Sequence, residues 1–143
     1  MLRIAWQPIS TRIVRELNAA GFDIAAAHMA VLKYPPPDGV RPIEIAANAR
    51  ISKQAVNYLI AQIEAHGYIE RRTVLGKGRL VFLTPAGHRL KDAAQAISCR
   101  IEAELQDAIG SEGWADFRAT LVRVGELVAT DGAREAAPRL RSG

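Results

Sequence analysis

The stretch from Arg41 to Arg72 constrains the fold of this chain most, because it holds two short helical patterns, a turn and a strand. It reads RPIEIAANARISKQAVNYLIAQIEAHGYIERR. Pro42 suits the first residue of a helix, since its missing N–H would have no helical partner there. Ser52 offers a hydroxyl that can cap the next helix. The order helix, turn, helix predicts a helix-turn-helix unit.

The second helical pattern of this unit has one apolar and one polar face. Val56, Leu59, Ile60 and Ile63 fall at i, i+3, i+4 and i+7 and form a single stripe. The opposite face carries groups that can read base edges, since Gln and Asn bond adenine bidentately and Lys reaches guanine. A solvent-exposed polar face is the commoner explanation for an amphipathic helix. The helix and turn before it and the basic segment after it favour a recognition helix. Its candidate DNA-binding residues are Ser52, Lys53, Gln54, Asn57, Tyr58 and Gln62.

A β-hairpin is predicted directly after the recognition helix. Residues 68–74 alternate like a strand, residues 75–78 can turn, and residues 79–83 can return as the partner strand. A hairpin in this place is the wing of a winged helix, and a basic wing can contact phosphates or enter the minor groove. The alternative is a solvated hairpin without a partner. The basic residues expected to contact DNA are Arg71, Arg72, Lys77 and Arg79.

Two helical segments are expected before this unit. Residues 1–10 are interpreted as irregular, because Pro8 is unsuited to a helix interior. A helix is predicted from about Ser10 to Ala20. Asp23 can cap a second helix over residues 24–34, which is apolar nearly all round and therefore expected to be buried.

Two long amphipathic helices are predicted after the wing. Thr84 and Pro85 open a helix to about Ile109, Gly110 ends it, and Ser111 caps a last helix to about residue 130. Their apolar stripes need a partner, and pairing with a second copy across a two-fold axis is favoured over folding back on the same domain. The expected organisation is an N-terminal dimerisation segment (1–22), a winged helix-turn-helix domain (23–84), C-terminal dimerisation helices (85–130) and a disordered tail (131–143).

Composition limits the class of protein. The chain has 143 residues, of which 49% are hydrophobic, and is long enough to bury a core. No apolar run approaches the ~20 residues of a membrane-spanning helix, and the N-terminus lacks the features of a signal peptide. A cytoplasmic protein without a membrane partner is therefore expected. The net charge of +4 fits an anionic partner. For the single cysteine, Cys99, a small buried hydrophobe is favoured over a redox switch.

Enzymatic chemistry is not expected. His28, His66 and His88 show none of the spacings of metal-binding motifs. Gly76-x-Gly78 is too short for a phosphate-binding loop. The acidic residues pair with no recognisable nucleophile. The sequence therefore predicts no catalytic residue, no cofactor and no metal.

The order of elements and four segments resemble the multiple-antibiotic-resistance regulator (MarR) family of winged-helix transcription factors over about residues 10–130. The segments are PIEIA (42–46), ISKQAVN (51–57), IEAHGYIER (63–71) and LTPAG (83–87). Neighbouring winged-helix regulators, such as the PadR type, share much of this pattern. Such families usually carry an Asp two residues before the wing arginine, where this chain has Lys77.

The resemblance implies a mostly α fold with a small β-hairpin wing, and a homodimeric, sequence-specific regulator of transcription. Such a dimer would act, often as a repressor, on a pseudo-palindromic site in double-stranded DNA. Family members often bind small phenolic or lipophilic ligands, so a small-molecule effector that releases the DNA is also implied. The alternative is a winged-helix module for protein–protein contacts. The polar face of the recognition helix favours DNA, because such a module would not need it.

Overall fold

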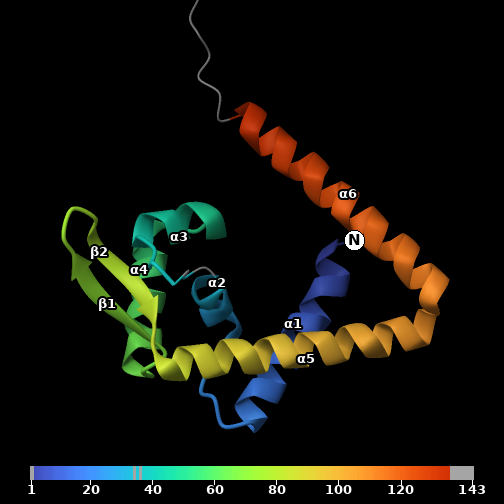
Figure 1. Cartoon of the computed structure of the whole chain (residues 1–143), viewed down its shortest axis with the longest axis horizontal. Helices are drawn as coiled ribbons and strands as arrows, with labels where there is room; N and C mark the ends of the chain where they lie inside the picture. The colour runs from blue at the N-terminus through green and yellow to red at the C-terminus, as the bar shows by residue number, and fades with distance from the viewer. Residues whose placement is uncertain (1, 34, 36, 136–143) are drawn as a thin grey trace, which may run out of the picture. The chain divides into compact units, whose positions relative to one another are not determined.

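The chain is mostly α-helical with one β-hairpin, as expected from the sequence. The computed structural model describes residues 2–33, 35 and 37–135. The chain divides into two units, Met1–Arg100 and Ile101–Gly143. The elements, drawn in Figure 1, are α1 (Leu2–Ala19), the 3-10 helix η1 (Ala26–His28), α2 (Met29–Leu32), α3 (Pro42–Ala49), α4 (Lys53–Ala65), β1 (Ile69–Val74), β2 (Gly78–Leu83), α5 (Pro85–Ile109) and α6 (Ser111–Glu135).

Helices α3 and α4 form the predicted helix-turn-helix unit. Pro42 is the first residue of α3, and the hydroxyl of Ser52 caps α4 by accepting a hydrogen bond from the Ala55 amide at 3.1 Å. The chain turns between the two helices at Arg50, whose φ of 53° lies in the left-handed region that few non-glycine residues adopt. The apolar stripe of α4 is buried as predicted, at Val56, Leu59, Ile60 and Ile63.

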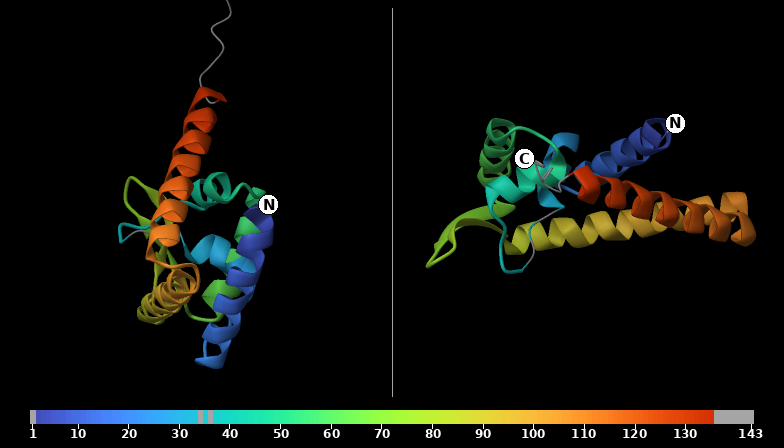
Figure 2. Two further views of the ribbon diagram at one scale, coloured as in Figure 1. Left: turned by 90° about the vertical axis from the view of Figure 1, so that its right-hand side faces the viewer. Right: turned by 90° about the horizontal axis from the view of Figure 1, so that it is seen from above.

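Strands β1 and β2 form the antiparallel hairpin. Ile69 pairs with Leu83 at its base, and Val74 pairs with Gly78 beside the turn. Val81 and Leu83, which lie on one face of β2, are buried in the first unit, and Leu80 on the opposite face is buried as well. The turn itself projects away from the helices of that unit (Figure 2). This arrangement leaves the residues at the turn exposed.

A short third piece of sheet, which the sequence analysis did not predict, joins the hairpin. Val40 bridges Val81, and their amides and carbonyls bond reciprocally at 3.1 and 2.8 Å. Gly39 precedes this bridge with a φ of +79°, and a Cβ placed on it would lie 2.6 Å from the Phe82 ring. Only glycine fits there. The segment leading into α3 is therefore fixed to the wing.

The expectation of an irregular N-terminus was wrong, because α1 runs from Leu2 and contains Pro8. Proline has a φ compatible with a helix and removes only one helical hydrogen bond, so the helix continues through it at a cost of about 3 kcal/mol. Farther along α1, Ile13 and Leu17 are buried. Packing of these side chains offsets the local cost of the proline.

The second helix was also predicted wrongly. Asp23 does not cap it, because the backbone N–H of Asp23 donates to the Tyr68 hydroxyl at 2.9 Å and the helical residues begin only after Ala25. A short 3-10 turn leads into α2 instead of one continuous helix. The residues of this segment are not buried all round, since Ala25 is exposed while His28 and Val31 are buried.

Helix α5 begins as predicted, with the Thr84 hydroxyl accepting a hydrogen bond from the Gly87 amide at 3.1 Å. Gly110, with a φ of +79°, ends α5. It also precedes α6 directly, so Ser111 is the first helical residue and not the cap. Helix α6 extends to Glu135, beyond the expected end. The rest of the predicted tail, residues 136–143, lies outside the described residues.

Cys99 is exposed on α5, so the expectation that it is buried was wrong. The buried apolar side chains of this helix are Leu90, Ile97 and Ile101. Cys99 lies two residues from both Ile97 and Ile101, and two residues turn a helix by about 200°, which places it on the opposite face. Among the described residues, no helix has both the length and the apolar character needed to cross a membrane.

Candidate nucleic-acid interface

The first two turns of α4 present polar side chains to solvent. Lys53, Gln54 and Asn57 are exposed. Within the described part of the chain, none of these three side chains takes part in a hydrogen bond or an ion pair. Their ammonium and amide groups are the types that recognise purine edges in the major groove. Ser52 is exposed beside them, but its hydroxyl is already used as the cap of α4.

Tyr58 and Gln62 lie farther along α4 and differ in exposure. The Tyr58 side chain is 65% exposed, whereas Gln62 is half-buried. The Gln62 amide nitrogen lies 3.2 Å from the Tyr58 hydroxyl, and the Gln62 amide oxygen lies 3.3 Å from Nε2 of His28. Gln62 therefore faces into the protein. The contact of His28 with Gln62 has no local signal in the sequence, because the two residues lie 34 positions apart.

Arg71 on β1 is held by Glu64 on α4. Arg71 Nε donates to Glu64 Oε2 at 2.8 Å, Arg71 Nη2 contacts the same oxygen, and the Arg71 amide donates to Glu64 Oε1 at 3.1 Å. The hydrogen bond from the Arg71 side chain lowers the pKa of the Glu64 carboxyl below its ordinary value. Both side chains are about two-thirds or more buried, at 26% and 31% exposure. This pair joins the wing to the helix.

Arg72 is also engaged inside the wing. Its Nε lies 3.0 Å from Glu70 Oε1, and its guanidinium carbon lies 3.9 Å from the centroid of the Phe82 ring. The second distance is that of a cation–π contact. Arg72 thus has an acidic partner and an aromatic partner within the hairpin.

Lys77 and Arg79 lie at and beside the hairpin turn, and both are exposed. Neither side chain forms a hydrogen bond or ion pair with the residues that the structure describes. Their positive charges are therefore presented to solvent. Of the four basic residues predicted to contact DNA from the wing, Lys77 and Arg79 thus form no ion pair within the described residues, whereas Arg71 and Arg72 bond carboxylates of the same chain.

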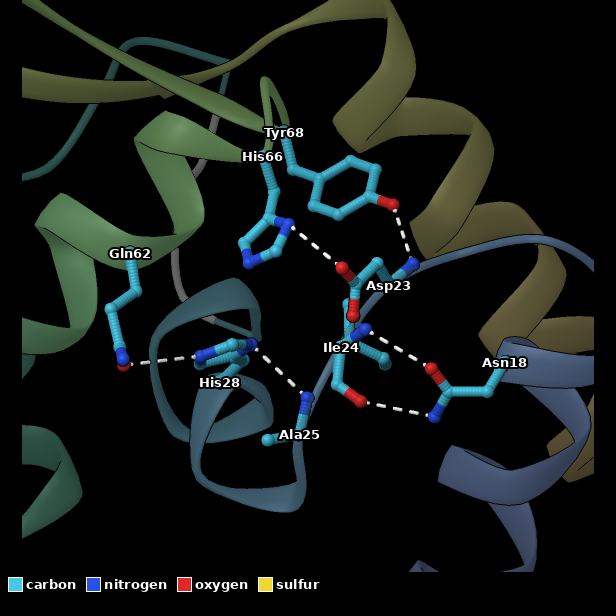
Figure 3. Close-up of polar contacts among 8 residues, drawn as sticks. All are labelled: Asn18, Asp23, Ile24, Ala25, His28, Gln62, His66 and Tyr68. Atoms are coloured by element: carbon cyan, nitrogen blue, oxygen red, sulfur yellow. Dashed lines mark hydrogen bonds and ion pairs between the residues drawn. The ribbon is translucent and has the colours of Figure 1, made fainter.

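A polar cluster fixes the carboxyl end of α4 to the loop after α1 (Figure 3). His66 Nδ1 lies 3.4 Å from Asp23 Oδ2, and the His66 ring stacks on Tyr68. The side-chain amide of Asn18 bonds both the amide and the carbonyl of Ile24, at 3.2 and 3.0 Å. The His66 contacts hold the carboxyl end of α4, and the Asn18 bonds fix the loop that it contacts. The amino-terminal turns of α4 stay exposed.

The same cluster brings together two histidines that are distant in the sequence. The rings of His28 and His66 have their centroids 5.9 Å apart. In the described part of the chain, no group of three or more His, Cys, Asp or Glu side chains could hold a metal ion. Both histidines contact neighbouring groups, His28 by hydrogen bonds and His66 by an ion pair and ring stacking.

A helix-turn-helix unit with an exposed polar second helix, followed by a β-hairpin with a basic turn, defines a winged helix. Known proteins show which winged-helix proteins the chain is similar to, and only the solved structures gave matches. No protein-family model matches the chain, and no curated protein matches it.

Solved structures do match. A crystal structure of a MarR-family transcription regulator has a TM-score of 0.72 and 21% sequence identity, covering 94% of this chain and 89% of that one. MepR, a transcription regulator of the Staphylococcus aureus multidrug efflux pump MepA, has a TM-score of 0.71 and 21% identity, covering 89% of this chain and 95% of its own. The S. aureus MepR–DNA complex has a TM-score of 0.68 and 21% identity, covering 89% and 93%. The chain has the winged-helix fold of the MarR-family regulators.

Proposed function

We propose that this protein is a sequence-specific DNA-binding regulator of transcription. In this proposal the amino-terminal turns of α4 enter the major groove, and the wing turn contacts the phosphate backbone or the adjacent minor groove. The observation that carries the proposal is the exposed, internally unpaired set Lys53, Gln54 and Asn57 on the second helix of a helix-turn-helix unit. The MepR–DNA complex among the structures with this fold supports it.

The active form in this proposal is a homodimer, with residues 1–22 and 85–130 as its dimerisation elements and residues 23–84 as its DNA-binding domain. Support comes from the apolar side chains that α6 exposes, at 44% for Phe117, 42% for Leu121 and 68% for Leu127. Exposed apolar surface of this kind is stabilised by burial against a partner. A two-fold dimer would place two α4 helices in successive major grooves and would bind a pseudo-palindromic site.

Repression, with release by a small lipophilic effector, is the form of regulation that we propose. Support comes from one protein of the same fold, MepR, which is a transcription regulator of a multidrug efflux pump and has also been solved bound to ethidium bromide. A reporter gene placed downstream of the bound DNA site tests whether the protein is a repressor. Expression of the protein should lower transcription of the reporter, and higher transcription would make the protein an activator.

Sedimentation equilibrium at micromolar concentration tests the dimer. The expected mass is twice that of the chain, and Leu121→Glu should shift it towards the monomer because a charge on the exposed stripe opposes burial. Glu112→Gln, at the start of the same helix and exposed, is the matched control and should leave the mass unchanged. A monomer at this concentration would contradict the homodimer.

A protein-interaction module is the competing function, in which the basic wing turn meets an acidic protein. Titration of a DNA duplex at several salt concentrations separates the two. Phosphate contacts release counterions, so DNA affinity should fall steeply as salt rises and should retain a sequence-dependent part at near-physiological salt. Binding that disappears altogether at that salt would favour the module.

A further inference from the structure

A chain of hydrogen bonds runs from the loop before η1, through the buried His28 side chain, to the exposed face of α4, and its direction can be assigned. It starts where the backbone N–H of Ala25 points at Nδ1 of His28, at 3.1 Å. A backbone N–H can only donate, so Nδ1 of His28 accepts. A neutral imidazole that accepts at Nδ1 carries its proton on Nε2. The tautomer of His28 is thus set by the backbone.

The orientation of the Gln62 amide follows from this tautomer. His28 Nε2–H donates to the Gln62 oxygen at 3.3 Å, which leaves the Gln62 nitrogen to donate to the Tyr58 hydroxyl at 3.2 Å (Figure 3 shows the first of these bonds). The reverse orientation would place the Gln62 NH₂ group against Nε2. His28 would then have to accept at both ring nitrogens, which a neutral or a protonated imidazole cannot do.

The hydroxyl of Tyr58 is the last group of this chain. Its oxygen accepts from Gln62, so its own proton remains to donate outward from a side chain that is 65% exposed. Each donor in the series points the same way, and bonds arranged so strengthen one another. His28 itself is buried, with 7% of its surface exposed. A residue away from the exposed face of α4 thereby determines how a group on that face is presented.

We propose that His28 is a positioning residue for DNA binding, which orients the Gln62 amide and thereby sets the Tyr58 hydroxyl as a hydrogen-bond donor to an acceptor atom on the DNA. This inference rests on the proposed function. It assigns Gln62 a supporting role instead of a contact with bases, and it assigns Tyr58 a donor role.

Two substitutions of His28 separate its two bonds. His28→Asn retains an oxygen near the position of Nδ1, which can accept from the Ala25 amide, but it is too short to reach Gln62. His28→Gln places an amide N–H near the position of Nε2, so it can still donate to Gln62. We expect His28→Asn to weaken binding of the dimer to a duplex selected from a random pool by about 25-fold, as for the loss of one hydrogen bond in each subunit. We expect His28→Gln to stay within about twofold of the original chain.

A double-mutant cycle with Tyr58→Phe shows whether His28 acts through the hydroxyl. Tyr58→Phe alone should weaken binding by a factor similar to that of His28→Asn, and the double variant should be no weaker than Tyr58→Phe alone. Equal weakening by His28→Asn in both backgrounds would overturn the proposal, and so would a His28→Gln variant as weak as His28→Asn. No effect of either substitution would overturn it as well.

Nitrogen NMR of the His28 ring tests the arrangement in the unmodified protein without DNA, and so does not depend on the variants folding. The expected signals are those of a ring that carries its proton on Nε2 and accepts a hydrogen bond at Nδ1. A ring protonated at Nδ1 would overturn the proposal. If the original chain selects no duplex, the proposed function fails, and this NMR result separates that failure from a failure of the His28 assignment.

Discussion

The four basic residues of the wing form two pairs that differ in what surrounds their charges. Arg71 and Arg72 on β1 bond the carboxylates of Glu64 and Glu70. Lys77 and Arg79 at the turn have no such bond within the described residues. The first pair holds the hairpin together and against α4, and the second pair is available to an external anion. Closeness in the sequence therefore does not give four charges the same surroundings.

The two pairs should differ most in how much DNA affinity is lost when one of their arginines is replaced by glutamine. Near 0.1 M salt, one phosphate contact is worth about tenfold in affinity, so Arg79→Gln should weaken a dimer that loses two contacts by about a hundredfold. The slope of log affinity against log salt should also fall by about 2. Fluorescence anisotropy with a selected duplex measures both quantities.

Arg72→Gln is the matched control for Arg79→Gln, since it removes the same charge from the neighbouring strand of the hairpin. Its effect on affinity should stay below about threefold, because Glu70 already offsets that charge. An Arg72→Gln variant as weak in DNA binding as Arg79→Gln would remove the distinction between the two pairs.

Substitutions in α4 should change sequence preference instead of overall affinity. Asn57→Ala should lose about 1–3 kcal/mol of discrimination at one base pair of the site, as for one bidentate contact. Binding to single-base variants of the duplex measures this loss. The salt slope should stay the same, in contrast to Arg79→Gln. Uniform weakening on all duplexes would mean that Asn57 contacts the backbone and not a base.

Arg71→Gln should act on stability more than on DNA binding. It removes the charged partner of a half-buried carboxylate, and the free energy of unfolding should fall by about 1–2 kcal/mol. Urea denaturation followed by circular dichroism measures the change. Arg79→Gln is the control and should remain within about 0.5 kcal/mol of the original chain. Equal stability of both variants would show that the Glu64–Arg71 pair does not hold the wing.

The smallest expected effect is the pH dependence of that stability. The Arg71 hydrogen bond lowers the pKa of Glu64 in the folded chain, so its contribution is present above the unfolded-state pKa and is lost as the pH falls through the lowered value. The difference in unfolding free energy between the original chain and Arg71→Gln should therefore be constant near neutrality and shrink below about pH 4.5. A difference that grows on acidification would contradict this pairing.

Local features were read correctly from the sequence, whereas contacts between distant segments were not. The cap at Ser52, the stripe from Val56 to Ile63 and the hairpin depend on neighbouring residues, and all appear in the structure. The predictions at Pro8 and Asp23 were wrong. Packing farther along α1 outweighs the local preference of Pro8, and a hydrogen bond to Tyr68 outweighs that of Asp23.

In the candidate nucleic-acid interface, too, local features could be predicted from the sequence and contacts between distant segments could not. The exposure of Lys53 and Gln54 follows from helical periodicity alone. The engagement of Arg71 by Glu64 and the bond between His28 and Gln62 depend on how strands and helices pack, so no spacing in the sequence indicated them. The bonding partners of charged and polar side chains could therefore be identified only from the structure.

Selection of bound duplexes from a random DNA pool at near-physiological salt tests the proposed function most directly. We expect a single two-fold symmetric motif, with half-sites about one helical turn apart, because two copies of α4 would read successive major grooves. Recovery of no motif, with binding that vanishes as salt rises, would leave only non-specific attraction of Lys77 and Arg79 to phosphate and would contradict a sequence-specific regulator.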